Sequence, residues 1–241
     1  MGLRIWAFVT THWNDAADAA RKGEPPLGLK LWHQRVQRYL SPEHCFLACG
    51  TWSEPSFSPL PIAVNVVNAG IPLGTPYNVW YTQLASCAFT AAMAYALRHS
   101  DKWDLLACLD TDILLGAVDF NMLIREFVHR SEIMLAQAWG SGIGGAFYVW
   151  KPAGAVRFLH GRLRANIIEP PMLLEDELAA IYKGCFWNPW PGCKTMRQDF
   201  GLSDPRPDSE AMLWPFVGRP SPTIIAEYER TQTPLAKPLQ P

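Results

Sequence analysis

The sequence predicts an α/β fold with a mostly parallel central sheet and helices on both faces. Apolar, strand-like runs alternate with segments of helical periodicity from the first residues onward, and parallel strands need such crossover connections. A charge-free stretch lies between Glu54 and Arg98, and no proline occurs from Tyr77 to Lys151, which marks this part as interior. With 241 residues and 49% hydrophobic content, the chain is long enough to bury a large core.

The expected elements follow one another along the chain. Strands are predicted at residues 3–11, 44–51, 62–67, 105–109 and 132–138, and helices at residues 27–40, 78–99 and 119–130. Pro42 stops the first helix, and the alanine content of the second suits close packing on a sheet. In open parallel sheets ligands bind at the carboxyl ends of the strands, so residues just after each apolar run are the candidates for function.

Composition excludes several classes of protein. The net charge is −1 and no basic run exceeds two residues, which argues against nucleic acid as a partner. The apolar stretch at residues 79–97 carries Thr82, Gln83, Ser86 and Thr90, which argues against a membrane span. The amino terminus turns polar too soon for a signal peptide, so a cytoplasmic location is expected.

The six cysteines contain no CxxC pair and are expected to be reduced, although Cys185 and Cys193 could form a disulfide or a metal site.

Two carboxylates follow the predicted strand at residues 105–109. In extended backbone, Asp110 and Asp112 point the same way and repel each other unless a cation lies between them. Oxygen ligands suit Mn²⁺ or Mg²⁺, which complete their coordination with water and substrate phosphates. The alternative is a solvated loop with a helix cap, because Asp is a common turn residue.

At this point the chain resembles a known family. DLLACLDTDILL (residues 104–115) resembles the metal-binding DxD segment of nucleotide-sugar glycosyltransferases of the GT-A fold, and is most similar to the glycogenin-like and lipopolysaccharide-galactosyltransferase-like families. GIGGAFYVW (142–150) resembles their glycine-containing strand beside the donor and acceptor sugars, and LEDEL (174–178) their downstream acidic motif. The resemblance covers about half of the chain.

The resemblance implies a single GT-A-like domain at residues 1–230, and the polar, proline-containing composition of residues 231–241 predicts a disordered tail. Residues 1–116 would form the nucleotide-binding half and residues 117–230 the acceptor-side half. The implied reaction moves a sugar from a nucleotide-diphosphate sugar, with a UDP-sugar favoured, to a hydroxyl of a glycan or a small molecule. The divalent ion held by Asp110 and Asp112 would neutralise the diphosphate leaving group.

Each implied role falls on particular residues. Asp176, or Glu175 as the alternative, is expected beside the anomeric carbon as a base, nucleophile or charge stabiliser, whereas helix capping would explain the same carboxylates without catalysis. The glycine-bearing strand at residues 144–149 is expected to deliver the chain to the carboxyl edge of the sheet.

Uncharged polar and aromatic residues before and around the DxD segment are expected to bind the donor: Thr10, Thr11, His12, Trp13, Asn78, Gln83 and Thr111, with Asp110 and Asp112. Glycines and loop tryptophans are expected to bind the acceptor: Gly144, Gly145, Trp187 and Trp190.

The match departs from the family in one respect. Glycogenin-like enzymes take a third metal ligand from a histidine near the C-terminus, whereas the last histidine here is His160. Asp204, Asp208 or Glu210 would replace it, or the DxD pair and the diphosphate alone would hold the ion, or the protein is an inactive nucleotide- or glycan-binding module. A nucleotidyltransferase is the other alternative, but the segment after the first strand lacks a basic, glycine-rich phosphate loop.

Overall fold

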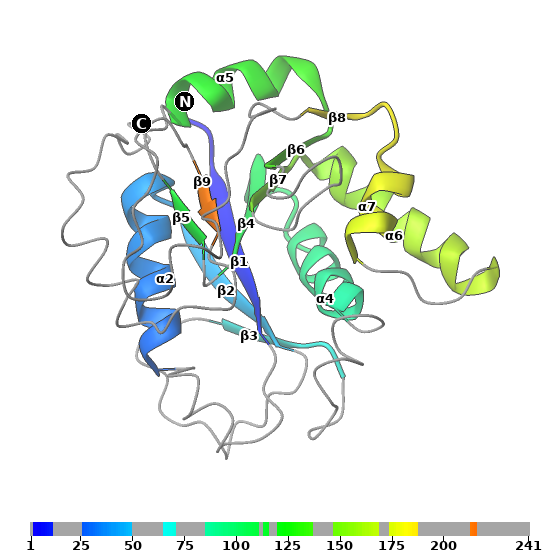
Figure 1. Cartoon of the computed structure of the whole chain (residues 1–241), viewed down its shortest axis with the longest axis horizontal. Coiled ribbons are helices and arrows are strands. Elements are labelled where there is room, and N and C mark those ends of the chain that lie inside the picture. The colour runs from blue at the N-terminus through cyan, green and yellow to red at the C-terminus, as the bar shows by residue number, and fades with distance from the viewer. Residues whose placement is uncertain are drawn as a thin grey trace, which may run out of the picture.

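The computed structural model describes residues 2–11, 26–49, 65–70, 85–110, 113–115, 120–136, 147–168, 174–187 and 213–215. Within these residues, a seven-stranded sheet has the order β3-β2-β1-β4-β7-β6-β8, and a two-stranded sheet pairs β5 with β9 (Figure 1). The large sheet is built from β1 (Ile5–Thr11), β2 (His44–Cys49), β3 (Asn65–Asn68), β4 (Leu105–Leu109), β6 (Ile133–Ala136), β7 (Phe147–Trp150) and β8 (Phe186–Trp187). The predicted α/β fold with a mostly parallel sheet is therefore confirmed.

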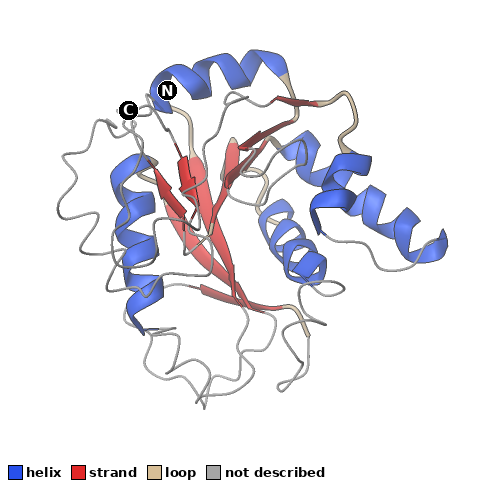
Figure 2. Ribbon diagram, viewed as in Figure 1, coloured by secondary structure: helices blue, strands red, loops and turns tan. Residues whose placement is uncertain are grey.

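Helices cover both faces of the large sheet. Figure 2 shows α2 on one side, α4, α6 and α7 on the other, and α5 across one end. The helices are α2 (Pro26–Tyr39), α4 (Ala85–Leu97), α5 (Phe120–Arg130), α6 (Pro152–Ile168) and α7 (Leu174–Ile181). Burial from both sides explains why every residue of β4 is buried and why its sequence is an unbroken apolar run.

The alanine-rich helix packs on the sheet as predicted. Ala88, Ala92 and Ala96 of α4 are fully buried, and Phe89 lies edge-on to Phe8 of β1 with the ring centroids 5.6 Å apart. Small side chains let the helix approach the strands closely, and the hydroxyl of Thr90 donates to the carbonyl of Ser86 at 2.7 Å instead of remaining unsatisfied. No helix in the described ranges is both long enough and apolar enough to cross a membrane.

Strand direction is where the fold departs from a simple parallel sheet. The pairs β1·β2, β1·β4, β2·β3 and β6·β8 are parallel, whereas β7 is antiparallel to both β4 and β6. The expectation that this glycine-bearing strand delivers the chain to the carboxyl edge is therefore wrong. The strand ends at the amino edge at Trp150, and α6, which the sequence patterns did not predict, carries the chain back.

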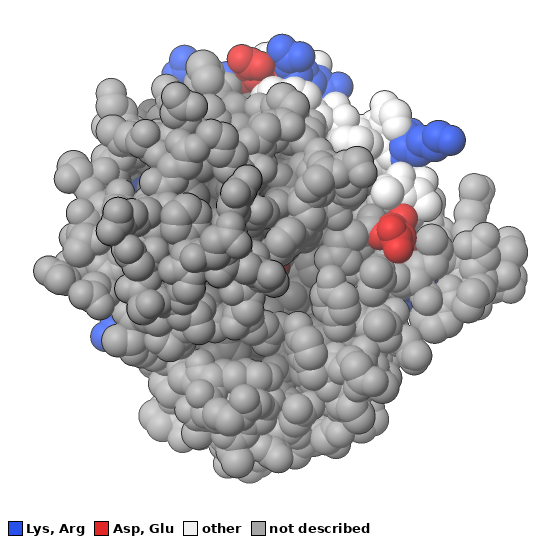
Figure 3. All heavy atoms as spheres, viewed as in Figure 1, with Lys and Arg blue, Asp and Glu red and all other residues white. Residues whose placement is uncertain are grey.

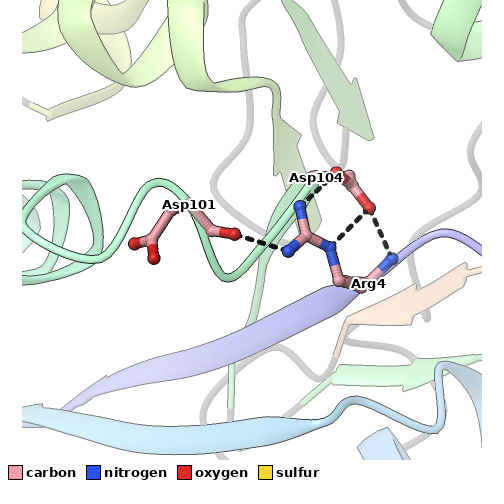
Figure 4. A network of polar contacts seen from close by, with 3 residues as sticks. All are labelled: Arg4, Asp101 and Asp104. Atoms are coloured by element: carbon pink, nitrogen blue, oxygen red, sulfur yellow. Dashed lines mark hydrogen bonds and ion pairs between the residues drawn. The ribbon is translucent and has the colours of Figure 1, made fainter.

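A polar network holds the amino edge together. The guanidinium of Arg4 donates through Nη2 to Oδ1 of Asp104 at 2.9 Å, and the Arg4 backbone N–H donates to Oδ2 at 2.8 Å (Figure 4). Arg4 also donates to the carbonyl of Asp101, so the approach to β1 is tied to the turn before β4. These hydrogen bonds lower the pKa of the Asp104 carboxyl.

Candidate functional site

The carboxyl ends of the parallel strands bring predicted donor residues together. The register that pairs Phe8 with Cys108 places Thr10 of β1 level with Asp110, the first residue after β4. On the other side of β1, Thr11 pairs with Cys49, and Cys49 pairs with Asn68. Thr10 and Asp110 are both partly exposed, so two predicted site residues lie at the ends of neighbouring strands on this edge.

The reversed strand also starts at this edge. Phe147 pairs with Leu109 on one side and with Ala136 on the other, so β7 begins beside the strand end that carries Asp110. The chain therefore enters β7 at the same edge where it leaves β1 and β4. The predicted acceptor glycines Gly144 and Gly145 precede this strand and lie outside the described residues.

A buried arginine reaches the same place from α2. Arg35 is 1% exposed, and its Nη2 donates to the backbone carbonyl of Asp110 at 3.5 Å. A buried guanidinium is costly unless anions or carbonyl dipoles compensate it, so its position favours negative charge at the end of β4. The sequence patterns did not single out this residue. The sequence feature that could have identified Arg35 is its position as a charged residue on the apolar face of the helix, where Trp32, Val36 and Tyr39 are buried beside it.

Asp110 acts on its surroundings electrostatically. Cys108 is fully buried, and burial, with a smaller contribution from the Asp110 carboxylate, raises the pKa of its thiol well above the usual value. The thiol is therefore a protonated core group, as expected of a reduced cysteine. Cys45, Cys87 and Cys185 are also free thiols. Cys193 lies outside the described residues, but Cys185 is free, so the disulfide considered for this pair is not formed in the structure.

The segment after the DxD residues pairs with the C-terminal part of the chain. In the antiparallel pair of β5 (Ile113–Leu115) and β9 (Leu213–Pro215), Ile113 lies opposite Pro215 and Leu114 opposite Trp214. A C-terminal strand therefore runs next to the residue that follows Asp112. Asp112 and the candidate third ligands lie outside the described residues: Asp204, Asp208 and Glu210.

The acidic motif begins α7 and splits into two environments. Asp176 is exposed, whereas Glu177 is buried and its Oε1 accepts a hydrogen bond from Nη1 of Arg162 in α6 at 2.8 Å. Nη2 of Arg162 also contacts the Cys87 sulfur at 3.8 Å, near the start of α4. The structure thus engages Glu177 in packing between helices and leaves Asp176 accessible. The side chain of Glu175 lies outside the described part.

A glycine follows the helix that carries these carboxylates. Gly184 has a φ of +76°, which glycine adopts without strain, and the N–H of Cys185 donates to the carbonyl of Tyr182 at 2.7 Å. The hydroxyl of Tyr182 donates in turn to the carbonyl of Gly154 at 2.6 Å, which fixes α7 against the first turn of α6. The acidic motif therefore lies on a helix that is anchored to α6.

Trp187 is the described member of the predicted acceptor tryptophans. It belongs to β8 at the edge of the large sheet, and the guanidinium of Arg130 lies over its ring, 5.2 Å from the centroid. This cation–π contact gives the ring a structural partner at the end of α5. The remaining predicted site residues fall outside the described ranges: His12, Trp13, Asn78, Gln83, Thr111 and Trp190.

Metal ligands and surface charge complete the geometry. Among the residues that the structure describes, no group of three or more His, Cys, Asp or Glu side chains converges to hold a metal ion. Figure 3 shows basic and acidic side chains next to each other over α5, where Arg130 pairs with Glu126 at 3.1 Å. Charges of both signs are thus mixed on this helix.

Comparisons with known proteins show the class of fold. The chain superposes with a TM-score of 0.52 on a glycosyltransferase involved in the glycosylation of the major capsid of PBCV-1, at 13% identity, covering 95% of this chain and 100% of that one. It superposes equally, at 0.52 and 10% identity, on the glycosyltransferase GlyE of Streptococcus pneumoniae TIGR4, covering 96% of this chain and 61% of that one. No protein-family model matches the sequence, and no curated protein matches it. The chain therefore has the fold of these glycosyltransferases.

Proposed function

We propose that the protein is a glycosyltransferase that uses a nucleotide-diphosphate sugar and binds it at the carboxyl edge of the large sheet. The observation that carries this proposal is the meeting of Thr10, Asp110 and Arg35 at the ends of β1 and β4. Hydroxyl, carboxylate and buried guanidinium together suit a ligand that combines hydroxyl groups with a charged diphosphate. The shared fold with two glycosyltransferases supports the same conclusion.

Asp110 and Asp112 would hold Mn²⁺ or Mg²⁺. Asp110 fits this role because it is partly exposed at a strand end, and because carboxylate oxygens are the ligands that these ions prefer. When bound, the ion would neutralise the charge that develops on the diphosphate leaving group. Arg35 would add a fixed positive charge below the same place, which needs no reorganisation during the reaction.

Asp176 would act on the transferred sugar or on the acceptor hydroxyl, with Glu175 as the alternative. Its exposed position at the start of α7 leaves its carboxylate accessible, whereas the neighbouring Glu177 is committed to Arg162. A base that accepts the hydroxyl proton would give inversion, and a nucleophile or charge stabiliser would give retention. A UDP-sugar remains the favoured donor, and the acceptor would be a glycan or a small molecule that contacts Gly144, Gly145, Trp187 and Trp190.

Hydrolysis of a panel of UDP- and GDP-sugars with Mn²⁺ tests this function. We expect the protein to release nucleoside diphosphate from one donor. Asp176→Asn should lower the rate of this release by about 100-fold and leave the affinity for UDP unchanged. Turnover equal to that of the parent protein in both Asp176→Asn and Glu175→Gln would mean that these carboxylates only cap the helix. Pyrophosphate release from a nucleoside triphosphate would instead identify a nucleotidyltransferase, and binding of glycan without any turnover a binding module.

A further inference from the structure

A polar pocket lies at the edge of the sheet opposite the candidate donor site. It has a volume of about 390 Å³ and forms where the second half of α2, the start of β2 and the start of β3 meet. The lining residues are His33, Gln37, Pro42, Glu43, His44, Cys45 and Asn65. At ~3.3 Å per residue, the length of β2 separates this pocket from the carboxyl edge by roughly 17 Å. One ligand of ordinary size therefore does not reach both places.

One wall of the pocket is held rigidly. Nε2 of His44 lies 3.2 Å from the hydroxyl of Tyr95 and 3.4 Å from Nδ2 of Asn65, and the His44 ring lies against the indole of Trp6 at 4.4 Å between centroids. Nδ2 of Asn65 also donates to the Tyr95 hydroxyl at 3.3 Å. These contacts fix the Asn65 side chain through its nitrogen, and no group in the described ranges donates to its oxygen, which can therefore accept a hydrogen bond from a ligand.

The other polar groups of the pocket are little used by the protein. Within the described residues, the ring nitrogens of His33 make no hydrogen bond, and the carboxylate of Glu43 interacts with Arg4 through its charge but forms no ion pair, because Arg4 is paired with Asp104. In the same part of the chain, the side-chain amide of Gln37 makes one weak contact, from Nε2 to the Cys45 sulfur at 3.9 Å. Imidazoles and amides without strong partners are groups that a bound molecule can satisfy.

The charge of the pocket selects the kind of ligand. Burial lowers the pKa of His33 and of His44, the latter also through His99 and Lys102, so both rings are neutral at neutral pH. The His33 ring offers one donor and one acceptor, whereas His44 offers its Nδ1, because its Nε2 contacts Tyr95 and Asn65. The lining contains no Lys or Arg and one carboxylate, which disfavours phosphate and other anions. Burial raises the pKa of the Cys45 thiol to about 12, so this sulfur is a poor metal ligand.

We propose that this pocket binds a neutral carbohydrate, at a subsite separate from the donor site. Imidazoles, amides and a carboxylate present the mixture of donors and acceptors that sugar hydroxyls require, and the volume falls in the range of small-molecule sites, about 300–1,000 Å³. The subsite adds a sugar contact that does not depend on nucleotide or metal. It would hold part of a glycan away from the place of transfer.

Titration of histidine-labelled protein with neutral sugars, followed by NMR, tests the subsite. The first probes are the methyl glycosides of glucose, galactose, mannose and N-acetylglucosamine. A tetrasaccharide built from the sugar that binds is the second probe. We expect at least one to shift the imidazole signals of His33 and His44 at millimolar concentration. His33→Ala and the exposed-site variant Asn65→Ala should each weaken binding by about tenfold, as loss of a ligand hydrogen bond implies.

Two control variants distinguish a sugar subsite from a general disturbance of α2 and from binding at the donor site. Gln34→Ala changes an exposed residue of α2 next to His33 but outside the lining, and should bind the sugar unchanged. Asp112→Asn should also leave sugar binding at the pocket unchanged, even where it removes nucleotide binding. The subsite and the proposed function can therefore fail independently of each other. The proposal is overturned if no probe moves either imidazole, if Asn65→Ala and His33→Ala bind as the parent does, or if only Zn²⁺ shifts these signals and EDTA reverses the shift.

Discussion

Removing the carboxylate of Glu177 should destabilise the protein far more than removing an exposed carboxylate. Glu177 is 4% exposed and its partner Arg162 is 13% exposed, so Glu177→Ala leaves a guanidinium largely out of water without its counter-charge. Breaking a buried ion pair in this way costs about 3–5 kcal/mol. A domain of ordinary stability has about 5–15 kcal/mol in total, so the variant should unfold at a clearly lower urea concentration.

The control and the double variant make this expectation specific. Glu126 pairs with Arg130 on the exposed face of α5, with side chains 43% and 55% exposed, and Glu126→Ala should cost at most about 0.5 kcal/mol. Replacing both members of the buried pair, Glu177→Leu with Arg162→Met, leaves no unpaired charge and should recover at least ~2 kcal/mol of the single-variant loss. Urea unfolding followed by circular dichroism measures all three variants. A loss below about 1 kcal/mol in Glu177→Ala would refute the claim that this pair is electrostatically buried.

Three further outcomes are expected. Gly154→Ala should destabilise the protein by about 1–3 kcal/mol, because its Cβ would overlap the backbone carbonyl of Glu132, and thermal unfolding against Ala153→Gly measures the loss. Stability should fall as pH drops from 7 toward 5, because burial lowers the pKa of His33 and His44 and the unfolded chain binds protons first; urea midpoints across this range that do not change would contradict it. Arg35→Met should keep the fold but weaken metal-dependent UDP binding by about tenfold or more, as calorimetry would show, because it removes a positive charge at the end of β4.

Local patterns in the sequence are sufficient for much of the sheet. They predict the strand at Leu105–Leu109 with the bounds that the structure has, because burial on both faces demands a continuous apolar run. They also predict the alanine-rich helix, although its described part begins at Ala85 and the predicted start at Asn78 is not described. Both elements follow from side-chain burial, which the sequence records directly.

Strand direction and α6 are not predicted by these patterns, and the reasons are physical. Periodicity within Phe147–Trp150 is the same for either direction, and only the short connection from Ala136 indicates an antiparallel pair. The helix α6 contains Gly154 and Gly161, which lower helix propensity. Both glycines serve tertiary contact: a Cβ on Gly161 would lie 2.5 Å from Cγ1 of Ile181, so helices α6 and α7 meet there through the missing side chain. Pro152 at the first helical position is the available signal.

The sequence predicts the candidate site in its parts rather than in its arrangement. Asp110 and Thr10 stand out by their positions after apolar runs, and the strand register places them level with each other. Arg35 does not stand out, because a charged residue on an apolar stripe looks like a flaw in the pattern, although its length lets it reach Asp110 from α2. Glu177 is the packed carboxylate of the acidic motif because it pairs with Arg162. The patterns do not predict the helix that carries Arg162, so they do not identify Glu177.

Calorimetric titration of UDP into the protein, with Mn²⁺ and with EDTA, tests the central claim most directly. The proposed nucleotide-sugar transferase should bind UDP with Mn²⁺ and lose most of that affinity with EDTA, because two carboxylates alone repel a diphosphate. Asp112→Asn should abolish the metal-dependent part without lowering stability, since this residue is proposed to supply charge rather than packing. UDP binding that is equally tight without metal, or in Asp112→Asn, would contradict a donor site built on these carboxylates.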